Sequence, residues 1–342
     1  MSDDALIVRV RRLLDHGSRI ESDALGFLFA RERELAEAVA LAALGQAALD
    51  DLIAAGLLRR TPDGYVGVVR LVRFEQALIA SDRYGFRRHR GFVMGPASSS
   101  QLLAGAVKPS NQGRGLDLGC GPGTHALRLA SWGMQALGID INERALGFAA
   151  FNRRLNDADT ATFARGDFLT APPDSALDER FDVVVANPPF VLAPASSLTY
   201  RDRPLARDET SRVTIERVVR AMAPGGRGYV VCNWVGDDAR DWDRAPKQWL
   251  KASGCRTAVS RVASLSAEQY AAIWNRDLIE PQRGEAIREW AATLAAEGTS
   301  HVHAGVLAIA KPRSAWIRRT RSISMAGPAR PDWRRLEEVL AA

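Results

Sequence analysis

Hydrophobic residues in the first 60 positions recur at the spacing of one helix face. Two groups carry this pattern, and their members are Leu6, Val10, Leu13, Leu14, Leu41, Leu44, Leu49, Leu52 and Ile53. Gly56 then ends the last predicted helix. After it, a Thr61–Gly64 turn separates Leu57–Arg60 from a β-branched stretch over Tyr65–Val72, which predicts a two-stranded hairpin.

Helices followed by a hairpin indicate a small N-terminal winged-helix domain, which we assign to residues 1–75. A winged helix that reads DNA needs Lys or Arg on the helix before the wing, because that helix contacts phosphates. Here that helix carries Asp50, Asp51 and mostly alanines. The composition therefore favours a packing or substrate-lid domain over a DNA-reading one.

Residues 76–112 form the predicted connection to the second domain. This segment contains Tyr84–Arg90, an aromatic and basic run that fits a surface facing nucleic acid and also fits a solvated edge. It also contains Gly95-Pro96 and Ser98–Ser100, which fit a closure over a ligand or a plain turn and helix cap. Both pairs of interpretations stay open at this level.

Short apolar stretches alternate with helical segments from residue 114 onward, which is typical of an α/β fold with a doubly wound parallel sheet. We place seven strands near residues 115–118, 135–140, 162–165, 181–186, 228–233, 256–264 and 302–310. Seven strands in this rhythm exceed the six of a simple dinucleotide-binding sheet. The second domain is predicted over residues 113–312, and a tail follows over residues 313–342.

The composition is that of an ordinary globular protein, with 46% hydrophobic and 25% charged residues among 342. No apolar stretch approaches the roughly 20 residues of a membrane span, and no basic leader is present, so we expect a cytoplasmic protein. Cys120, Cys232 and Cys255 form no Cys-x-x-Cys pair and fit free thiols. His301 and His303 have no carboxylate or cysteine beside them, so we expect no metal site.

The net charge of +6 is concentrated in the tail. Residues 311–335 contain a single acidic residue, Asp332. The same stretch contains eight basic residues, which are Lys311, Arg313, Arg318, Arg319, Arg321, Arg330, Arg334 and Arg335. The tail fits contacts to RNA phosphates and equally fits a disordered, solubilising end.

A glycine turn follows the first strand of the second domain. The segment Leu116–Thr124 runs from a strand through Gly119, Gly121 and Gly123 into a helix. Glycines let a ligand approach the backbone closely, and ligands of open α/β sheets bind at the carboxyl ends of the strands. A dinucleotide site would need a G-x-G-x-x-G pattern, which fits poorly because Pro122 separates the last two glycines. The turn therefore predicts a site for another small molecule.

Acidic residues follow the next two strands. Asp140 lies 23 residues after Asp117, close to the spacing at which a carboxylate accepts hydrogen bonds from ribose hydroxyls. The third strand is followed by Asp167, which offers a carboxylate to an adenine amino group, and by Phe168, which offers an edge to the adenine ring. The alternative role for each of these acids is a helix cap.

The segments Leu116–Gly123, Ile139–Asp140 and Gly166–Phe168 resemble, in order and spacing, the motifs of class I S-adenosylmethionine-dependent methyltransferases. The resemblance covers residues 90–310 and implies a seven-stranded Rossmann-like sheet whose last strand is antiparallel. It implies S-adenosylmethionine as the cofactor, with the glycines at its methionine portion and the acids at its ribose and adenine. The residues that the resemblance places at the cofactor are Asp117, Gly119, Cys120, Gly121, Gly123, Asp140, Ile141, Asp167, Phe168 and Asn187.

The fourth predicted strand ends in Asn187, Pro188, Pro189 and Phe190, which we predict to be the catalytic segment. The prolines stiffen the backbone and remove two donors, so backbone carbonyls point outward as acceptors. Asn187 adds its amide oxygen as a further acceptor. Such acceptors can hold the hydrogens of an NH2 group while Phe190 stacks on the flat system that carries it. Holding those hydrogens directs the nitrogen lone pair toward the methyl group, so positioning and electrostatics suffice without a strong base or a metal.

This tetrapeptide resembles the Asn-Pro-Pro-Tyr/Phe motif of amino-methyltransferases, which act on glutamine of release factors, on amines of ribosomal RNA bases and on adenine in DNA. The Phe ending is frequent in the RNA-directed members, whereas Val191–Pro194 resembles the glutamine enzymes. The predicted winged helix differs from the helical bundle of the glutamine enzymes. Tyr200 and Arg201 follow a Pro/Ala/Ser-rich segment, and we expect them in a loop that covers the substrate.

Three hypotheses on function follow. The leading one is an N-methyltransferase acting on a ribosomal RNA base or a protein glutamine. The second is a methyltransferase of a small amide- or amine-containing metabolite, and the third is a non-catalytic regulator that binds S-adenosylmethionine or DNA. The intact segment from Asn187 to Phe190 argues against the regulator, because binding alone needs no aligned acceptors. The basic tail and Arg87–Arg90 favour a polyanion, whereas Asp50 and Asp51 do not.

Overall fold

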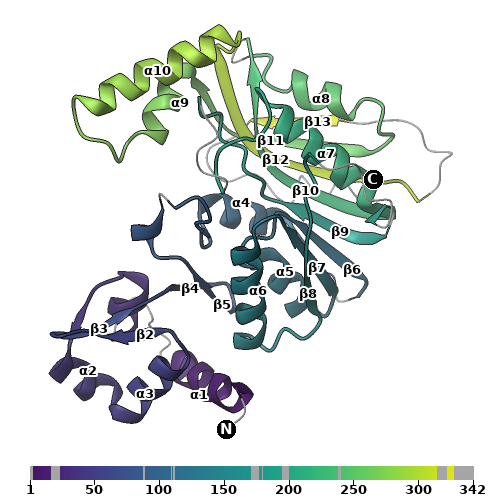
Figure 1. Cartoon of the computed structure of the whole chain (residues 1–342). Helices are drawn as coiled ribbons and strands as arrows, with labels where there is room; N and C mark the ends of the chain where they lie inside the picture. Colours follow the sequence, from purple (N-terminus) through teal and green to yellow (C-terminus); the bar gives the residue numbers. More distant parts are fainter. Residues whose placement is uncertain are drawn as a thin grey trace.

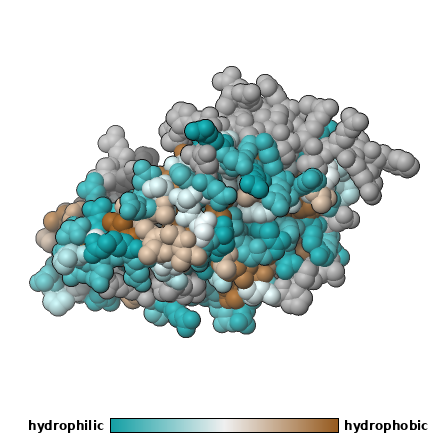
Figure 2. Space-filling model, turned by 90° about the horizontal axis from the view of Figure 1, so that it is seen from above, coloured by the Kyte–Doolittle hydropathy of each residue, from teal (hydrophilic) through white to brown (hydrophobic). Residues whose placement is uncertain are grey.

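A computed structural model of the chain is shown in Figure 1. The structure describes residues 3–16, 24–87, 89–108, 110, 112–170, 177–178, 180–194, 200–237, 240–313 and 322–326. Within these ranges, no helix combines the length and the apolar character needed to cross a membrane. The face drawn in Figure 2 carries mostly hydrophilic side chains, and hydrophobic ones form separate small patches between them.

An eight-stranded sheet of order β13-β11-β12-β10-β9-β6-β7-β8 forms the centre of the fold. The strands are β6 (Arg114–Leu118), β7 (Gln135–Asp140), β8 (Ala161–Arg165), β9 (Phe181–Ala186), β10 (Met222–Gly236), β11 (Arg256–Ser266), β12 (His301–Ala310) and β13 (Ser322–Ala326). Strands β6 to β10 are parallel to one another, whereas β12 is antiparallel to both β10 and β11. The predicted seven-stranded, mostly parallel sheet is thus confirmed for β6 to β12.

The eighth strand comes from the tail. Strand β13 pairs in parallel with β11, with Thr257 opposite Ser322 and Arg261 opposite Ala326. We had predicted no strand over residues 313–342, because the basic residues there obscure the short alternating stretch Ser322–Ala326. The rest of that tail, apart from Arg313, lies outside the described residues.

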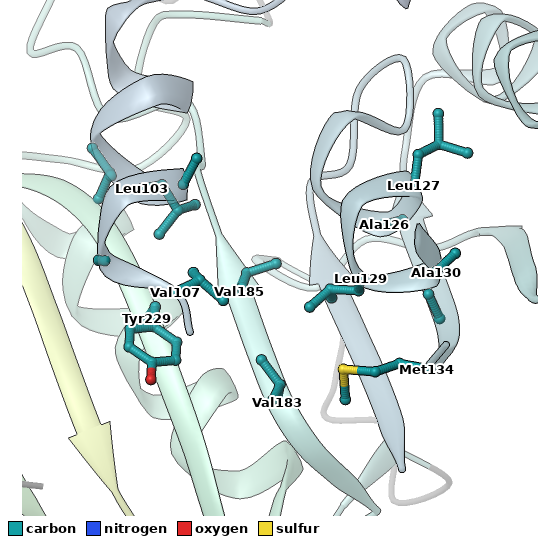
Figure 3. Close-up of a cluster of buried hydrophobic side chains, with 14 of the residues drawn as sticks. Leu103, Val107, Ala126, Leu127, Leu129, Ala130, Met134, Val183, Val185 and Tyr229 are labelled. Atoms are coloured by element: carbon teal, nitrogen blue, oxygen red, sulfur yellow. The ribbon is translucent and has the colours of Figure 1, made fainter. Parts of the chain in front are cut away.

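Helices cover both faces of the sheet, because the side chains of a strand alternate between its two faces. In β9, Val183 and Val185 pack against α4 (Ser98–Ala106) and α5 (Thr124–Ser131), as Figure 3 shows. Val184 points to the opposite face and packs with α7 (Glu209–Ala221) and α8 (Arg244–Leu250). This two-sided burial explains why residues 183–186 of the strand are an unbroken apolar run in the sequence.

The N-terminal part contains helices and a small antiparallel sheet of order β1-β3-β2. Its elements are α1 (Asp3–His16), η1 (Gly26–Ala30), β1 (Leu35–Ala36), α2 (Glu37–Leu44), α3 (Gln46–Ala54), β2 (Leu58–Arg60) and β3 (Gly64–Gly67). The predicted hairpin is present, with Leu58 opposite Gly67. The stretch over Tyr65–Val72 is not one strand, however, because β3 ends at Gly67 and β4 (Arg70–Phe74) pairs with β5 (Ala77–Ser81) instead. The winged-helix assignment and the domain boundaries remain predictions.

Helix α6 (Glu143–Leu155) joins the N-terminal part to the large sheet. Its buried Leu155 belongs to the same hydrophobic cluster as Leu14 of α1 and Leu49 of α3. The amide of Asn152, which is fully buried, accepts a hydrogen bond from the Ala80 N–H at 2.8 Å. The same amide donates to the carbonyls of Ala80 and Pro122, both at 2.9 Å. One side chain thus ties β5 to the glycine turn.

Asn156 makes a similar but less buried contact next to the C-terminal end of α6. It accepts from the Leu78 N–H and donates to the Leu78 carbonyl, both at 2.8 Å. The two side-chain amides therefore pair with the backbone of β5 as a neighbouring strand would.

Asn152→Ala is expected to lower the free energy of unfolding by about 3 kcal/mol, because three buried backbone groups lose their partners. Urea denaturation at pH 7 measures this change. Asn156→Ala is the matched control and should cost about 1 kcal/mol, since Asn156 itself is only half-buried and water can replace its amide. Equal losses of less than 1 kcal/mol for both variants would contradict the role given to Asn152.

Asp117 lies inside the fold, in the middle of β6. Its side chain is buried, and one carboxylate oxygen accepts from the Ala126 N–H of α5 at 2.9 Å. Burial is the main cause that raises the pKa of Asp117 to about 7, and the charge of Asp140 adds to the rise. The hydrogen bonds from the backbone at Ala126 and His125 act in the opposite direction.

Asp117→Asn should change how stability depends on pH. The folded state holds the Asp117 proton up to about pH 7, whereas the unfolded chain releases it near pH 4. Native stability therefore falls as pH rises between these values, by on the order of 4 kcal/mol. The variant lacks this loss, so it should match the native chain near pH 4 and exceed it at pH 7.5 in urea denaturation. A stability difference that stays constant with pH would show that Asp117 is charged in the fold.

Candidate active site

Three parallel strands bring the predicted functional residues to one edge of the sheet. Leu118, the last residue of β6, lies opposite Ile139 of β7 and opposite Ala186 of β9. The residues that follow these three in the chain are Gly119, Asp140 and Asn187. The sheet register therefore sets them side by side at the carboxyl ends of the strands, where open α/β sheets bind ligands.

The glycine turn has a left-handed backbone at Gly119, Gly121 and Gly123, with φ of 74°, 53° and 85°. Among the described residues, nothing lies within 4 Å of a Cβ built on Gly121, so open space adjoins this residue. A Cβ on Gly123 would instead lie 3.0 Å from the ring of Phe163 and 3.2 Å from Ala149. Gly121 thus fits a close approach by a ligand, whereas Gly123 is needed for packing against α6.

Cys120 and Asp117 support the turn from inside. The N–H groups of Gly119 and Cys120 both donate to the carbonyl of Ile139. The Cys120 side chain is buried, and burial raises the pKa of its thiol well above the ordinary value, so it stays protonated. Asp117 faces α5 through Ala126. The side chains of both residues are buried beneath the turn, and their contact with the cofactor stays a prediction.

Asp140 connects the glycine turn to the start of α6. Its carboxylate accepts from the Gly121 N–H at 2.8 Å and from the Asn142 N–H at 2.9 Å. Burial raises the pKa of Asp140, and these backbone donors offset part of the rise. The Ile141 N–H is a third backbone donor to this carboxylate. A carboxylate has about four acceptor positions, so about one remains for a further donor such as a ribose hydroxyl. Ile141 follows it with 56% of its surface exposed, and a flat ring could cover it.

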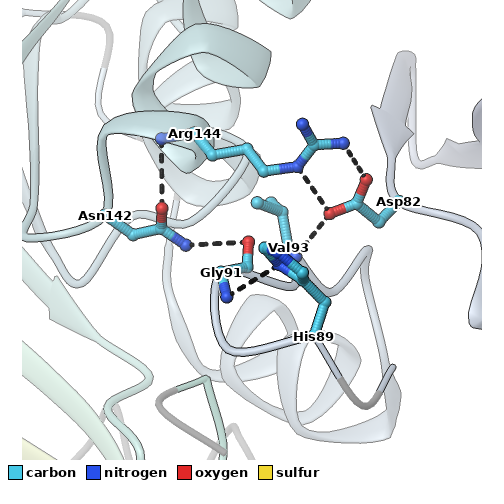
Figure 4. Close-up of polar contacts among 6 residues, drawn as sticks. All are labelled: Asp82, His89, Gly91, Val93, Asn142 and Arg144. Atoms are coloured by element: carbon cyan, nitrogen blue, oxygen red, sulfur yellow. Dashed lines mark hydrogen bonds and ion pairs between the residues drawn. The ribbon is translucent and has the colours of Figure 1, made fainter. Parts of the chain in front are cut away.

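Figure 4 shows how residues 82–87 and 89–93 are fastened to Asn142 and Arg144, which follow Asp140 in the chain. Asn142 donates from its amide to the Gly91 carbonyl at 3.3 Å. Arg144 donates to both carboxylate oxygens of Asp82, at 3.0 Å and 2.5 Å, and Asp82 also accepts from the Val93 N–H. These contacts hold the predicted aromatic and basic run, which includes η2 (Tyr84–Phe86), next to the cofactor half of the site.

The carboxylate of Asp167 binds backbone groups that follow it closely in the chain. One carboxylate oxygen accepts from the N–H groups of Leu169 and Thr170, at 3.0 Å and 2.9 Å. This arrangement corresponds to the capping alternative, so its predicted contact with adenine stays a prediction. Phe168 lies 3.5 Å from a Cβ built on Gly119, and its carbonyl accepts from Arg217 of α7 at 2.9 Å. The ring thus borders the glycine turn, and its contact with the adenine ring stays a prediction.

Asn187 stands half-buried at the end of β9. Its amide nitrogen donates to the hydroxyl of Ser99 at 3.2 Å and to that of Ser100 at 3.5 Å. Pro188 is buried and Pro189 is half-buried. Phe190 packs against hydrophobic clusters on both sides of the loop, so part of its ring is engaged in the core. The structure thus brings Ser98–Ser100, the first turn of α4, to the predicted catalytic segment.

The segment after Phe190 is braced by α9 (Ala267–Trp274) and α10 (Gln282–Ala296). The hydroxyl of Tyr270 accepts from the Leu192 N–H at 3.1 Å and from the amide of Asn233 at 2.8 Å. Sequence reasoning missed both Tyr270 and this role of the serines. Only the serine run gave a local signal, because the contact of Tyr270 arises from the packing of distant segments.

Tyr200 and Arg201, the predicted substrate residues, have different surroundings. The Val191 N–H donates to the Arg201 carbonyl at 2.9 Å, so this loop returns to the catalytic segment. Arg201 donates to Asp202 at 2.6 Å, and its guanidinium lies over the rings of two tryptophans, Trp274 and Trp290. Tyr200 contacts the Phe92 ring edge-on, with centroids 4.8 Å apart. Tyr200 thus borders Phe92, whereas Arg201 already binds Asp202 and the two tryptophans.

His301 and His303 have stacked rings with centroids 6.3 Å apart, and Nδ1 of His303 lies 2.9 Å from the Ser264 hydroxyl. Burial lowers the pKa of His303 to about 4, so it is neutral at pH 7. A search of the described residues finds no group of three acidic, histidine or cysteine side chains that could hold a metal ion. The pair therefore has the surroundings of packed strand residues.

Known proteins were compared with the chain. Residues 109–265 match the family model described as a methyltransferase domain. Ribosomal RNA small subunit methyltransferase C of Klebsiella pneumoniae is 30% identical over 140 residues, and that of Erwinia tasmaniensis is 28% identical over 136. Each match covers 39% of this chain. It covers 35% of the relative, so the chain spans about a third of the length of these relatives.

Two further proteins illustrate the range of similarity. Release factor glutamine methyltransferase of Aliivibrio fischeri is 32% identical over 78 residues, which cover 22% of this chain and 26% of that protein. Among solved structures, the YcgJ protein of Bacillus subtilis aligns with a TM-score of 0.41 and 14% identity, over 64% of this chain and 99% of that one. The methyltransferase family model covers the glycine turn, Asp140 and Asn187 together. Residues 109–265 are therefore similar to a methyltransferase domain, and this similarity agrees with the cofactor that the sequence predicts, S-adenosylmethionine.

Proposed function

We propose that this protein transfers a methyl group from S-adenosylmethionine to the planar NH2 nitrogen of an RNA base. The observation that carries the proposal is the place of Asn187, one strand away from Gly119 and two from Asp140 in the sheet. Its amide nitrogen is engaged by Ser99 and Ser100, so its oxygen is the group left for a substrate. An acceptor beside a cofactor turn is what an NH2 substrate needs.

The chemistry depends on this acceptor. S-adenosylmethionine, when bound, supplies a methyl group on a positively charged sulfur. The Asn187 oxygen accepts a hydrogen bond from the substrate NH2, which becomes stronger as positive charge builds on the nitrogen. The nitrogen lone pair forms the new bond to carbon while the carbon–sulfur bond breaks, and the nitrogen then releases a proton to water. Asn187 therefore stabilises the transition state more than the ground state.

RNA is favoured over protein by the surroundings of the site. Tyr84 and Phe86 are 47% and 55% exposed, and Arg87 lies beside them on the segment that Arg144 and Asn142 fasten. Exposed aromatic rings stack on unpaired bases, and arginines bind the phosphates between them. The relatives named as ribosomal RNA methyltransferases agree with this choice. Methylation of a protein glutamine is the alternative, and fractionation of the labelled extract distinguishes it from methylation of RNA.

Asn187→Ala should lower methyl transfer by about 100-fold or more while the affinity for S-adenosylmethionine changes less than threefold, because a transition-state contact is lost. Tritiated S-adenosylmethionine and extract from cells lacking this protein measure transfer, and calorimetry measures affinity. Unchanged turnover would contradict the mechanism.

Fractionation of the same extract identifies the acceptor. Label is expected in RNA, and its incorporation should fall steeply between 50 and 200 mM salt, as binding through phosphates does. Label in release factors or other proteins would show that the methyl acceptor is a protein glutamine and not an RNA base. Label confined to small molecules would overturn the macromolecular substrate.

Asp140→Ala should show the opposite profile. Removal of the carboxylate is expected to weaken S-adenosylmethionine binding at least tenfold, because charge-assisted hydrogen bonds to the ribose are lost. Calorimetric titration measures this loss, and turnover at saturating cofactor should change far less than in Asn187→Ala. Asp159→Ala, at a side chain that is 87% exposed, serves as the control and should bind normally. Normal binding of S-adenosylmethionine by Asp140→Ala would show that Asp140 does not contact the cofactor.

A further inference from the structure

Two segments that are far apart in the sequence meet through one ion pair beside the candidate active site. Arg87, directly after η2, donates to the carboxylate of Asp277 at 3.4 Å, and the two residues are 190 positions apart. Asp277 lies between α9 and α10, the helices that brace the chain after Phe190. The two side chains are 49% and 65% exposed. The pair therefore joins the aromatic and basic run to the helices beside the catalytic segment.

Arg87 also lies near the loop that returns to the catalytic segment. Burial raises the pKa of the Tyr200 hydroxyl, and the positive charges of Arg201 and Arg87 lower it in part. Tyr200 directly precedes Arg201, whose carbonyl accepts from the N–H of Val191. Val191 is the first residue after the catalytic segment. The positive charge of Arg87 is thus close to the chain on which the proposed chemistry depends.

The rings of Tyr84 and Phe86 accompany Arg87 on a fixed backbone. The Tyr84 N–H donates to both carboxylate oxygens of Glu32, at 3.0 Å and 3.1 Å. The guanidinium of Arg70 lies 5.0 Å from the centre of the Tyr84 ring. These contacts fix Tyr84, while its ring and that of Phe86 stay exposed. Fixed, exposed rings suit the stacking of unpaired bases.

The pair of Arg87 and Asp277 is weak enough for its partners to be exchanged. Ion pairs between exposed side chains stabilise a protein only slightly, because water screens both charges. A phosphate group offers a guanidinium two parallel hydrogen bonds, which together are stronger than one long contact of 3.4 Å. A phosphate that approaches the rings can therefore replace Asp277 as the partner of Arg87.

We infer that Arg87 binds a phosphate of single-stranded RNA whose bases stack on Tyr84 and Phe86, and that Asp277 competes with this phosphate. The inference rests on the proposed function, in which RNA is the methyl acceptor. It adds the form of the RNA and a residue that limits its affinity. Because Arg87 must leave Asp277 when RNA binds, removal of the Asp277 charge strengthens RNA binding.

An oligouridylate labelled with fluorescein is the probe for the phosphate contact, because its bases are unpaired. Fluorescence anisotropy with the full chain measures its Kd. Arg87→Ala should weaken binding about fivefold and lower the slope of log Kd against log salt by about 0.7, the value for one phosphate of a single strand. Phe86→Ala should weaken binding by a similar factor without changing the slope, because a stacking contact is lost. An RNA duplex should bind more weakly than the oligouridylate, since its bases are already paired.

Asp277→Asn tests the competition. This variant should bind the oligouridylate about threefold more tightly, because no ion pair is lost on binding. In an Arg87→Ala background the same substitution should change the Kd by less than a factor of about 1.5, since the guanidinium that Asp277 holds is absent there.

Asp159→Asn is the matched control, because it removes the same charge from another exposed ion pair, that of Asp159 with Arg153 at 3.2 Å. Asp159 precedes β8, so it lies at the opposite edge of the sheet from the site, and its substitution should leave the Kd unchanged. An equal gain from Asp277→Asn with and without Arg87 would overturn the competition, because charge alone would then explain the gain. An unchanged salt slope in Arg87→Ala would overturn the phosphate contact.

These binding measurements need no methyl transfer, so the inference and the proposed function can fail separately. If Asn187→Ala keeps normal turnover while Arg87→Ala and Asp277→Asn behave as expected, the proposed chemistry fails and the RNA surface stands. If label enters RNA but Asp277→Asn changes the Kd no more than Asp159→Asn does, only the competition fails. If the oligouridylate does not bind and label enters protein, both fail.

Discussion

The hydrogen-bonded register of β7, β6 and β9 is the constraint on which the rest of the site depends. It places Ile139, Leu118 and Ala186 in one row, so the next residue of each strand emerges at the same edge. A shift by one residue in any of the three would turn the side chains of that strand to the opposite face. The apolar side chains buried on both faces, such as Val184 and Val185, therefore fix the geometry of the active site as well as the fold.

Helix α6 connects this edge of the sheet to the N-terminal part. Its first turn follows Asp140 and is fastened to the segment 82–93 through Asn142 and Arg144, while Asn152 binds both β5 and the carbonyl of Pro122. Each of these contacts replaces water around a group that would be costly to bury alone. The N-terminal part is thereby attached beside the glycine turn and Asp140.

Sequence reasoning succeeded where chemistry follows from neighbouring residues. The glycine turn and Asp140 could be predicted because a strand, a turn and a helix are contiguous there, and both meet at the sheet edge as expected. It does not tell a ligand contact from a cap, so the cofactor contacts of Asp117 and Asp167, whose carboxylates accept from nearby backbone N–H groups, stay predictions. Contacts such as Ser99 with Asn187 depend on packing between distant segments, which no local pattern encodes.

A crystal structure of the full chain with S-adenosylhomocysteine and an adenosine-containing oligonucleotide would test the central claim most directly. The account predicts ribose hydroxyls within hydrogen-bond distance of Asp140, the ring of the cofactor adenine against Ile141, and the sulfur facing the Asn187 oxygen. An exocyclic amine of the oligonucleotide should lie between that oxygen and the sulfur. A cofactor bound elsewhere, or an Asn187 that turns its nitrogen toward the substrate, would contradict the account.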